Sequence, residues 1–535
     1  MVVRKIGAAL LVLALAPAAA ADDAPTVAAS TATTDPAYVP PDFMAALPPL
    51  PPHVDAAKVW RLSLADALQV ALHDNLGIVL EREQVAVTTH GVGVAGGAFE
   101  PTIAASYDHN RADSPPVTVQ EGIAGQNILF VTDDWRLTLS DRLETGTLLS
   151  LDFTNGRAYS PVSGTAIEPL NYRSALTATI TQPLLRGFSP DLVIPRIDIL
   201  RAKLATEHER AQLAVTAADI VQRTENAYWD VVQALYSYDL QRRSQKRAED
   251  QMALTHRQID AGLMPPSDLI AAQSTLAQRD LQVLQAEATI DQSYDVLRSV
   301  LDLPRDQWSR PILPVEPPQF VAQHNSAEDE LGVALKHRPE IAQLDLDLQT
   351  ALLAVRQAEN NELPQLDVGI SGQLIGQDDQ YGATLGGLGR ADSHAYSLVL
   401  NFIWTPLRRA TAAQTAIERT HHQMAIVRRD QAVQDIWFAV RDAVRNQASA
   451  ARQVLAASKF RQLSTQSLEV EQRKFLSNQS SNFTLAQHQD ELAQAQLAEL
   501  QAVLVHKKAT AALLKATGLL LDQRHIQLDV TTPAR

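Results

Sequence analysis

Apolar and polar side chains alternate in several short segments, which predicts β-strands with one apolar and one polar face. The alternating segments are residues 102–108, 133–154, 176–181, 366–371 and 396–404. This pattern is typical both of a half-buried sheet in a soluble protein and of a membrane barrel with lipid outside and water inside. Aromatic residues of the kind found at membrane interfaces favour the barrel; they are Tyr107, Trp135, Phe402 and Trp404.

Other parts of the chain are predicted to be helical, from their lack of helix-breaking residues and from a seven-residue repeat of apolar positions. Residues 196–261 and 407–517 contain neither glycine nor proline and are rich in strong helix formers. A helix over residues 196–261 would be about 100 Å long, which no compact domain needs. Apolar residues also recur every seven positions as Leu269, Leu276, Val283, Ile290 and Leu297. We therefore expect a mainly α fold with β segments, in which long helices pack side by side as coiled-coil hairpins.

The two halves of the chain resemble each other. At one constant offset Leu269 pairs with Leu485 and Leu297 with Leu513. The matched blocks follow the same order in both halves: short helices, strands, long helix, tip and return helix. The sequence therefore predicts an internal duplication.

These patterns divide the chain into six parts. We expect a signal peptide at 1–21, a Pro-rich N-terminal arm at 22–61, a first structural repeat at 62–303 (β segment 99–183, long helical hairpin 189–303), a linker at 304–326, a second structural repeat at 327–521 (β segment 364–406, long helical hairpin 407–517), and a C-terminal tail at 522–535.

The first residues have the three-part form of a secretory signal peptide. Arg4 and Lys5 are basic, residues 6–16 are almost purely apolar, and Ala19 to Ala21 supply small residues for cleavage. No other segment has 18 consecutive apolar residues. We therefore expect the mature chain to cross a membrane only as a closed β-barrel. Neither repeat has enough strands to close one, so several chains would share it.

Charge and composition exclude several functions. The chain has 61 acidic residues against 46 Lys and Arg, a formal net charge of -15, which argues against nucleic acid as a partner. It has no cysteine, which excludes disulfides, thiolate metal sites and cysteine nucleophiles.

The remaining motifs do not support a catalytic, cofactor-binding or metal site. Residues 91–96 match G-x-G-x-x-G, but the motif follows a predicted helix and precedes a strand, the reverse of a dinucleotide-binding loop. His421 and His422 are adjacent, so on a helix they point about 100° apart and do not readily bind one ion. We expect the protein not to be an enzyme.

At this point the residues resemble the outer membrane efflux protein (TolC) family, over about residues 62–521. Phe99-Glu100-Pro101 leads into the first strand, residues 181–187 close the first β segment, and residues 404–407 close the second. Residues 260–263, Asp-Ala-Gly-Leu, resemble the family's glycine-leucine hairpin turn, and residues 478–485 are their counterpart in the second repeat.

The resemblance implies a homotrimer in the outer membrane of a Gram-negative bacterium, with a large periplasmic part. Each chain would give four strands to a shared twelve-stranded transmembrane β-barrel, and its hairpins would form a trimeric α-barrel. Proteins of the family are passive exit ducts of tripartite efflux or type I secretion systems. Their partners are a periplasmic adaptor (membrane fusion protein), an inner-membrane pump or transporter, and outer membrane lipid.

The sequence departs from the family in two places. Residues 133–154 supply an additional alternating pair, which would lengthen the barrel strands, form an external hairpin or raise the strand count. Thr484 stands where some members carry a carboxylate that narrows the pore entrance.

The hairpin tips are the candidate sites. An apolar, exposed tip suits docking to a partner's helical hairpin. We expect adaptor docking at Gly262, Leu263, Met264, Asp268, Asn478, Ser480, Asn482 and Phe483. We expect the periplasmic gate region at Asp260, Asp268 and Thr484. The alternative function is a soluble periplasmic coiled-coil scaffold or adaptor.

Overall fold

The structure is a computed structural model that describes residues 59–115, 127–159, 170–262, 264–477 and 479–528, with a few isolated positions before them. The expected signal peptide, most of the N-terminal arm and the last half of the C-terminal tail lie outside these residues. The strands are β1 Trp60–Leu62, β2 Thr102–Ser114, β3 Ile128–Arg142, β4 Leu148–Tyr159, β5 Leu170–Pro183, β6 Ile312–Pro314, β7 Gln365–Asp378 and β8 Ser393–Ile403. The helices are α2 Leu64–Asp74, α3 Leu76–Gly96, α4 Ile197–Asp260, α5 Ser267–Leu301, α6 Ala327–His337, α7 Pro339–Asn361, α8 Tyr381–Arg390, α9 Arg409–Leu476, α10 Asn482–Ala516 and α11 Leu520–Gln523.

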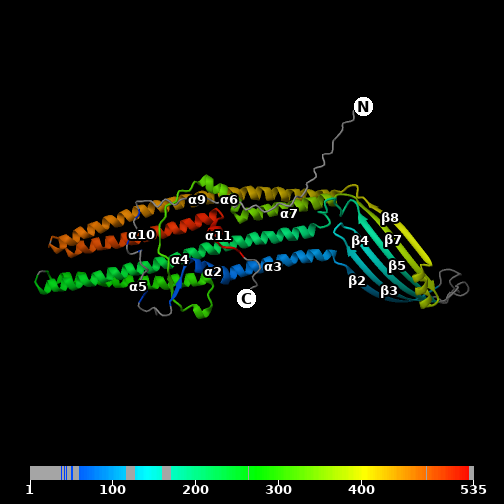
Figure 1. The fold of residues 1–535 in the computed structure, drawn as a ribbon, viewed down its shortest axis with the longest axis horizontal. Helices are drawn as coiled ribbons and strands as arrows, with labels where there is room; N and C mark the ends of the chain where they lie inside the picture. The colour runs from blue at the N-terminus through cyan, green and yellow to red at the C-terminus, as the bar shows by residue number, and fades with distance from the viewer. Residues whose placement is uncertain are drawn as a thin grey trace, which may run out of the picture.

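The molecule is long, with a sheet at one end and helical hairpins at the other (Figure 1). The mainly α fold with β segments that the sequence predicts is confirmed. No helix among the described residues is long and apolar enough to span a membrane.

The sheet has six antiparallel strands in the order β2-β3-β4-β5-β7-β8. The pair β3 and β4, which covers the additional alternating segment, lies within this sheet between β2 and β5. Of the three alternatives for residues 133–154, a raised strand count is therefore the one observed. The four strands per chain that the resemblance implies are wrong for this protein, because its extra hairpin pairs along its full length with both neighbours.

The two faces of the sheet differ in chemistry. Cross-strand pairs place Leu137, Phe153, Leu176 and Leu374 in one row, and we call their side the apolar face. Many large side chains on this face are exposed, such as Leu137 and Leu398, the latter to 73%, whereas Phe153, Leu176 and Leu374 are half-buried. The opposite, polar face carries hydrogen-bonded side chains from neighbouring strands, which satisfy one another across the sheet. These bonds join Thr138 to Asp152 (2.7 Å), Gln373 to Thr177 (3.0 Å) and Ser371 to Ser397 (2.8 Å).

The short helix α8 lies on the apolar face at the end of the sheet farthest from the long helices (Figure 1). It joins β7 to β8 and packs on β7 and β5. Thr384 is fully buried there, and its hydroxyl donates to the backbone carbonyls of Gln380 (3.0 Å) and Tyr172 (3.4 Å). A Cβ atom on Gly376 would overlap the carbonyl oxygen of Thr384. Glycine at this position therefore permits the close approach of helix and strand.

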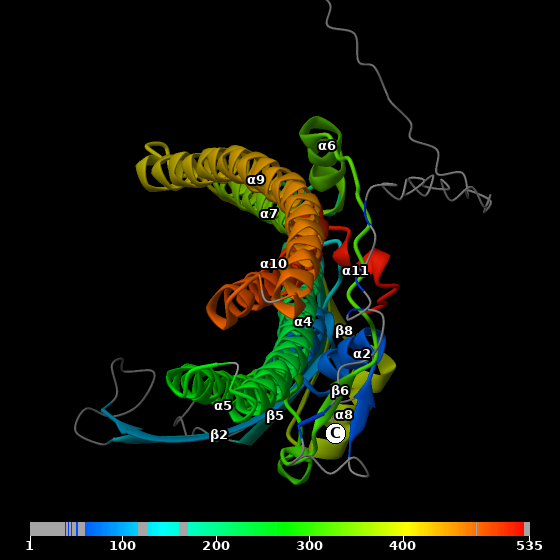
Figure 2. The ribbon, with the colours of Figure 1, turned by 90° about the vertical axis from the view of Figure 1, so that its left-hand side faces the viewer.

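The long helices form two hairpins, α4 with α5 and α9 with α10. Seen end-on, they follow an open arc (Figure 2). The heptad residues Val283, Ile290 and Leu297 of α5 are buried, because this stripe faces neighbouring helices. Toward the tip the same stripe is only partly buried at Leu269 and Leu276.

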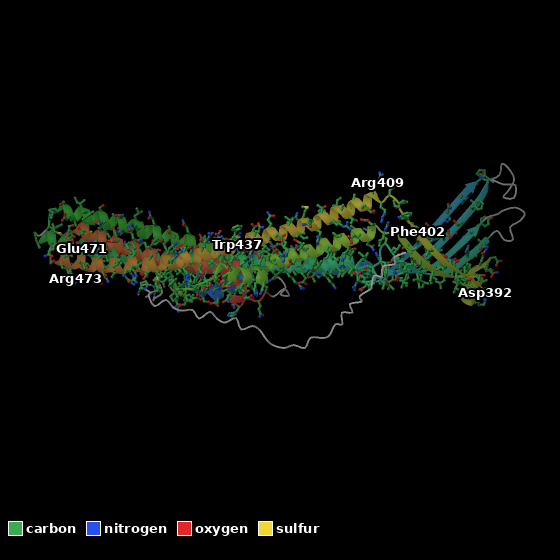
Figure 3. All side chains as sticks on the ribbon, turned by 90° about the horizontal axis from the view of Figure 1, so that it is seen from above. Asp392, Phe402, Arg409, Trp437, Glu471 and Arg473 are labelled. Carbon is green, nitrogen blue, oxygen red and sulfur yellow. The ribbon has the colours of Figure 1, made fainter. Side chains whose placement is uncertain are left out.

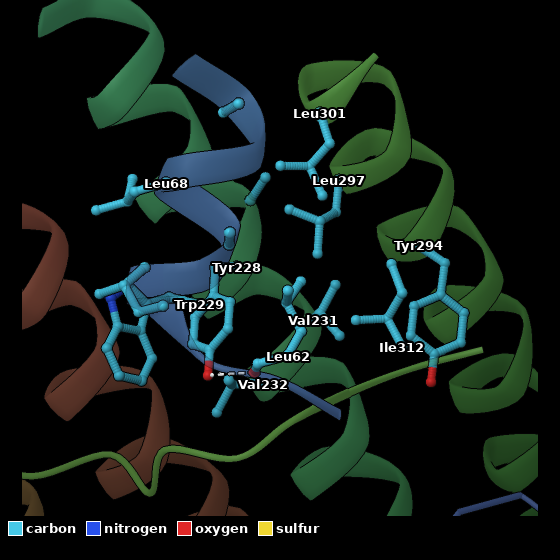
Figure 4. Packing of buried hydrophobic residues seen from close by; sticks show 14 of the residues in the cluster. Leu62, Leu68, Tyr228, Trp229, Val231, Val232, Tyr294, Leu297, Leu301 and Ile312 are labelled. Atoms are coloured by element: carbon cyan, nitrogen blue, oxygen red, sulfur yellow. Dashed lines mark hydrogen bonds between the residues drawn. The ribbon is translucent and has the colours of Figure 1, made fainter. Parts of the chain in front are cut away.

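The largest apolar core lies in the middle of the molecule, where α2, α3 and the paired strands β1 and β6 pack against α4 and α5. Tyr228 and Trp229 of α4 lie at its centre with Leu297 and Ile312 (Figure 4). The buried Tyr228 hydroxyl donates to the carbonyl of Leu62 at 3.2 Å. In this core, segments from both halves of the chain pack against the buried middle part of α4.

A buried amide is one of the contacts at the junction between the helices and the sheet. The side chain of Asn360, at the end of α7, accepts a hydrogen bond from the Gly187 nitrogen (2.7 Å) and donates to the carbonyls of Leu185 (3.3 Å) and Phe188 (2.9 Å). All three partners belong to the segment that follows β5. This amide therefore ties the end of α7 to the segment that leads from β5 to α4.

Candidate docking and gate region at the hairpin tips

The structure brings the two hairpin tips of the chain together. Leu468, Phe475 and Leu485 of the second hairpin form a buried apolar cluster. Met264 and Leu254 of the first hairpin pack against it. The expectation that Met264 is exposed is therefore wrong, because its side chain is half-buried between the two tips. Its assignment to the docking surface stays a prediction. Figure 3 shows the second tip at the end of the molecule opposite the sheet, where Glu471 and Arg473 are labelled.

The first tip is a tight turn after α4. Gly262 has φ of +70°, a conformation that side chains other than glycine rarely adopt, and its nitrogen donates to the Ile259 carbonyl at 2.9 Å. Asp260 is exposed and pairs with His256 one turn earlier, with 2.9 Å between Oδ2 and Nδ1. Leu263 lies outside the described residues.

The second tip is held by side-chain hydrogen bonds. The Ser481 hydroxyl accepts from the Thr484 nitrogen at 3.2 Å and so caps the start of α10 at Asn482. Thr484 is thereby a capping partner and supplies no charge. Phe483 is 79% exposed beside it. Asn478 lies outside the described residues.

A carboxylate does lie at the second tip, although at a position that sequence reasoning missed. Glu471 of α9 is 6% exposed, accepts a hydrogen bond from the Ser480 hydroxyl, and pairs with Lys474 at 3.1 Å. These two contacts hold the pKa of Glu471 below its usual range. Glu471 is therefore ionised at neutral pH, and it restrains Ser480.

A groove of about 220 Å³ runs between the two hairpins next to the tips. Its walls come from α4, α5 and the start of α10, and four of its residues are alanines: Ala248, Ala271, Ala272 and Ala486. Asp268 of α5 and Phe483 of α10 also line it. Small side chains leave room for the ridge of another helix. Of the expected docking residues, Asp268 and Phe483 thus line one surface.

An ion pair between a buried arginine and a partly exposed aspartate links the hairpins near this groove. The Arg279 side chain of α5 contacts the Asp490 carboxylate of α10 and donates to Gln282 at 2.9 Å. Arg279 is 7% exposed, and burial lowers its pKa. The sequence contains a signal for this ion pair. Arg279 occupies the same heptad position as Ala272, one heptad earlier, and Ala286, one heptad later. A cation buried at such a position is unfavourable unless an acidic side chain pairs with it.

Two further buried ionisable side chains lie between the helices away from the tips. Glu225 of α4 is 1% exposed and accepts two hydrogen bonds from the Arg524 guanidinium, at 2.6 and 2.9 Å. His506 of α10 is 3% exposed and stacks edge-on against Phe320, with ring centroids 4.8 Å apart. Burial lowers the pKa of His506 to about 4, so the ring is neutral at physiological pH.

The other motifs of the sequence have structural roles. Residues 91–96 lie in the last turns of α3 and therefore form no phosphate-binding loop. His421 lies on α9 with its side chain 60% exposed and its Nδ1 3.4 Å from Glu418. Within the described ranges, no group of three or more histidine and acidic side chains is placed to hold a metal ion.

Comparisons with known proteins place this fold. The sequence matches no family model, and a search of curated proteins gave no match. Several solved structures do match. The Campylobacter jejuni CmeC outer membrane channel is similar over 85% of this chain and 86% of its own, with a TM-score of 0.60 and 13% identity.

Two further solved structures agree with this likeness. The outer membrane protein VceC of Vibrio cholerae is similar over 85% of this chain and 96% of its own, with a TM-score of 0.59 and 13% identity. The open state of the Neisseria gonorrhoeae MtrE outer membrane channel is similar over 85% and 89%, with a TM-score of 0.59 and 16% identity. This chain therefore has the fold of these outer membrane channel proteins, and the resemblance to the outer membrane efflux protein (TolC) family is confirmed at the level of the fold.

Proposed function

We propose that this protein is the outer membrane channel of a tripartite efflux or type I secretion system, and that it acts as a passive duct. The exposed apolar face of the sheet carries the proposal. A soluble protein rarely leaves a continuous apolar surface exposed, and lipid is the solvent that such a surface fits. The polar face, with its ladder of hydroxyl and amide groups, then faces water inside a barrel.

The proposed number of chains follows from the need to close the β-barrel and from the resemblance to the outer membrane efflux protein (TolC) family, which implies a homotrimer. Strands β2 and β8 each have one edge that pairs with no described strand, and an open edge buried in lipid is costly. Pairing β2 of one copy with β8 of the next in a homotrimer gives a closed barrel of eighteen strands, six from each chain. At about 4.8 Å between strands and a tilt of about 40°, its backbone diameter is about 36 Å, against about 24 Å for twelve strands. A barrel of this size holds an aqueous channel.

The long helices complete the duct. Three copies of the open arc in Figure 2 would close into a periplasmic α-barrel below the membrane. The same order of short helices, strands and long hairpin in both halves supports an internal duplication. We assign the protein no catalytic activity; the energy for export comes from an inner-membrane pump or transporter, reached through a periplasmic adaptor.

The hairpin tips would serve docking and gating. The alanine-lined groove beside Asp268 and Phe483 fits a helical ridge of the adaptor. Gly262 and Ser480 lie in the turns that frame it, and Asn482 is the first residue of α10 beside them. We place the gate at the tips, with Asp260, Asp268 and Thr484 in its region and the Arg279 link to Asp490 holding the two hairpins of each chain closed. Leu263 and Asn478 keep their assignment to the docking surface as part of this proposal.

Two experiments test the proposal. Protein reconstituted in a planar bilayer should give stepwise ion conductance, and the absence of any conductance from correctly assembled protein would refute the channel. Ala272→Trp should fill the groove and abolish export of toxic compounds in cells, without changing the conductance of the purified protein. Ala277→Trp on an exposed position of the same helix is the matched control. The soluble scaffold is favoured instead if the protein leaves cells with the periplasmic fraction.

A further inference from the structure

A second cavity, of about 590 Å³, lies on the apolar face at the end of the sheet farthest from the helices. It belongs to neither hairpin tip. Strands β2 to β5 form its floor and α8 forms one wall. Its walls and its floor differ in chemistry, and together they define a ligand.

The walls are two aromatic pairs. Tyr107 and Trp135 stand on neighbouring strands with ring centroids 5.1 Å apart, and they are 54% and 62% exposed. Tyr172 of β5 and Tyr381 of α8 form the second pair, at 5.9 Å. Rings exposed in this way present flat, weakly polar surfaces on which another ring can stack.

The floor is polar. The Asp133 carboxylate accepts hydrogen bonds from the Tyr107 hydroxyl (2.8 Å) and from Arg157 (3.3 Å), and it lies 2.7 Å from His109 Nδ1. The Arg157 side chain is half exposed, so its other N–H groups remain available. The floor therefore offers both a carboxylate acceptor and a guanidinium donor.

One floor residue has no hydrogen-bond partner in the described part of the chain. Asn155 is 8% exposed and lines the cavity, yet its side-chain amide bonds to none of the described residues. Its cross-strand neighbour Ser174 is fully buried, and the hydroxyl there also lacks a partner among them. Ser174 does not line the cavity, so of this pair only the Asn155 amide, which can both donate and accept hydrogen bonds, faces a ligand there.

The lining of the cavity becomes less polar from one end of β4 to the other. Along β4, Arg157, Asn155, Phe153 and Leu151 follow one another on the same face. The face thus changes from charged through polar to fully apolar over four successive side chains. A ligand that fits it is polar at one end and apolar at the other.

We propose that this cavity binds the sugar headgroup of a membrane glycolipid. A sugar ring has an apolar C–H face for the Tyr and Trp walls, and hydroxyls that both donate and accept for Asn155, Asp133 and Arg157. Its lipid chains would lie along Phe153 and Leu151. A headgroup that carries only a phosphate and no sugar fits less well, because the negatively charged Asp133 carboxylate would repel the phosphate. The inference rests on the proposed function, which places the apolar face in lipid.

The test uses the full-length protein in phosphatidylcholine nanodiscs and native mass spectrometry. The probes are lipopolysaccharide as glycolipid, phosphatidylglycerol as an anionic lipid without a sugar ring, and the oligosaccharide of the same lipopolysaccharide without its lipid. The wild-type protein should retain lipopolysaccharide in preference to both others. Asn155→Leu and Trp135→Ala should each lower that retention about tenfold, and Asn401→Leu, on the polar face, should leave it unchanged.

Three results would overturn the inference. Equal retention by wild type and both variants would show that the cavity is not the site. Equal retention of phosphatidylglycerol would reduce it to general lipid contact. Equal binding of the free oligosaccharide would make it a site for soluble sugar. Conductance of the same preparation is measured in parallel: conducting protein without glycolipid refutes only this inference, whereas non-conducting protein that retains glycolipid refutes the proposed channel.

Discussion

Replacing Gly376 by alanine should detach helix α8 from the sheet. An alanine Cβ at this position would overlap the carbonyl oxygen of Thr384 and lie 3.0 Å from the nitrogen of Leu388, both in the backbone of α8. Neither atom can move without the helix, so α8 has to shift outward by more than about 1 Å. Overpacking of this kind costs about 1–3 kcal/mol. The docked population of α8, relative to the undocked one, should therefore fall about 5- to 150-fold.

Hydrogen exchange measures this change directly. Amides of residues 381–390 in the assembled protein should exchange faster in Gly376→Ala by the same factor, while amides of β7 and β5 should change little. Gly372→Ala is the matched control, since it lies on the same strand and the same face but has no atom within 4 Å of the added Cβ. Equal exchange of α8 in the two variants would refute the reasoning that close backbone approach holds the helix.

Three other changes have defined outcomes. Asp490→Asn removes the charge that Arg279 pairs with, so the hairpin tips should separate more readily and the open fraction of single channels should rise. Arg524→Met leaves the buried Glu225 carboxylate without its cation and should cost about 3–5 kcal/mol, seen as a lower thermal midpoint. His506 keeps a pKa of about 4 when folded against about 6.5 when unfolded, so the unfolded state binds more protons between these values. Stability should then fall by at most about 3 kcal/mol as pH drops from 6.5 to 4, and His506→Leu should remove that part of the loss.

Each of these has a contradicting result. An unchanged open fraction in Asp490→Asn would show that other contacts hold the tips. A loss below about 1 kcal/mol in Arg524→Met would show that water reaches Glu225. An identical fall in thermal midpoint with pH for wild type and His506→Leu would assign the acid sensitivity to other groups.

The main elements could be predicted because their signals are local. The heptad stripe through Val283, Ile290 and Leu297 predicts which side of α5 is buried, and this prediction does not require knowledge of the elements that pack against the helix. Alternation in residues 102–108 and 396–404 likewise predicts strands with two different faces. The place of the extra hairpin within the sheet could not be predicted, since strand order depends on pairing between distant segments.

Helix α8 is the clearest element that the sequence does not predict. It contains Gly382, Gly386, Gly387 and Gly389, and glycine disfavours helices by about 1 kcal/mol per residue. The helix exists because its small residues fit against the sheet beside Gly376. That fit is a tertiary contact with no local pattern.

The sequence predicted that the two hairpin tips lie together at one end of the molecule, but not all of the contacts between them; the docking and gating roles of the tips stay predictions. The tips were identified from turn signals, and Asp268 and Phe483 do line the groove between them. Met264 was wrongly expected to be exposed, since nothing in its own segment shows that the second tip covers it. Glu471 was missed because it lies on a helix among many acids, and only its contacts with Ser480 and Lys474 distinguish it.

The native mass of the protein extracted from isolated outer membranes in mild detergent tests the central claim most directly. The proposed channel predicts a homotrimer that requires detergent for extraction and that conducts ions when reconstituted. A monomer or dimer released without detergent would contradict the shared barrel and favour the soluble periplasmic scaffold.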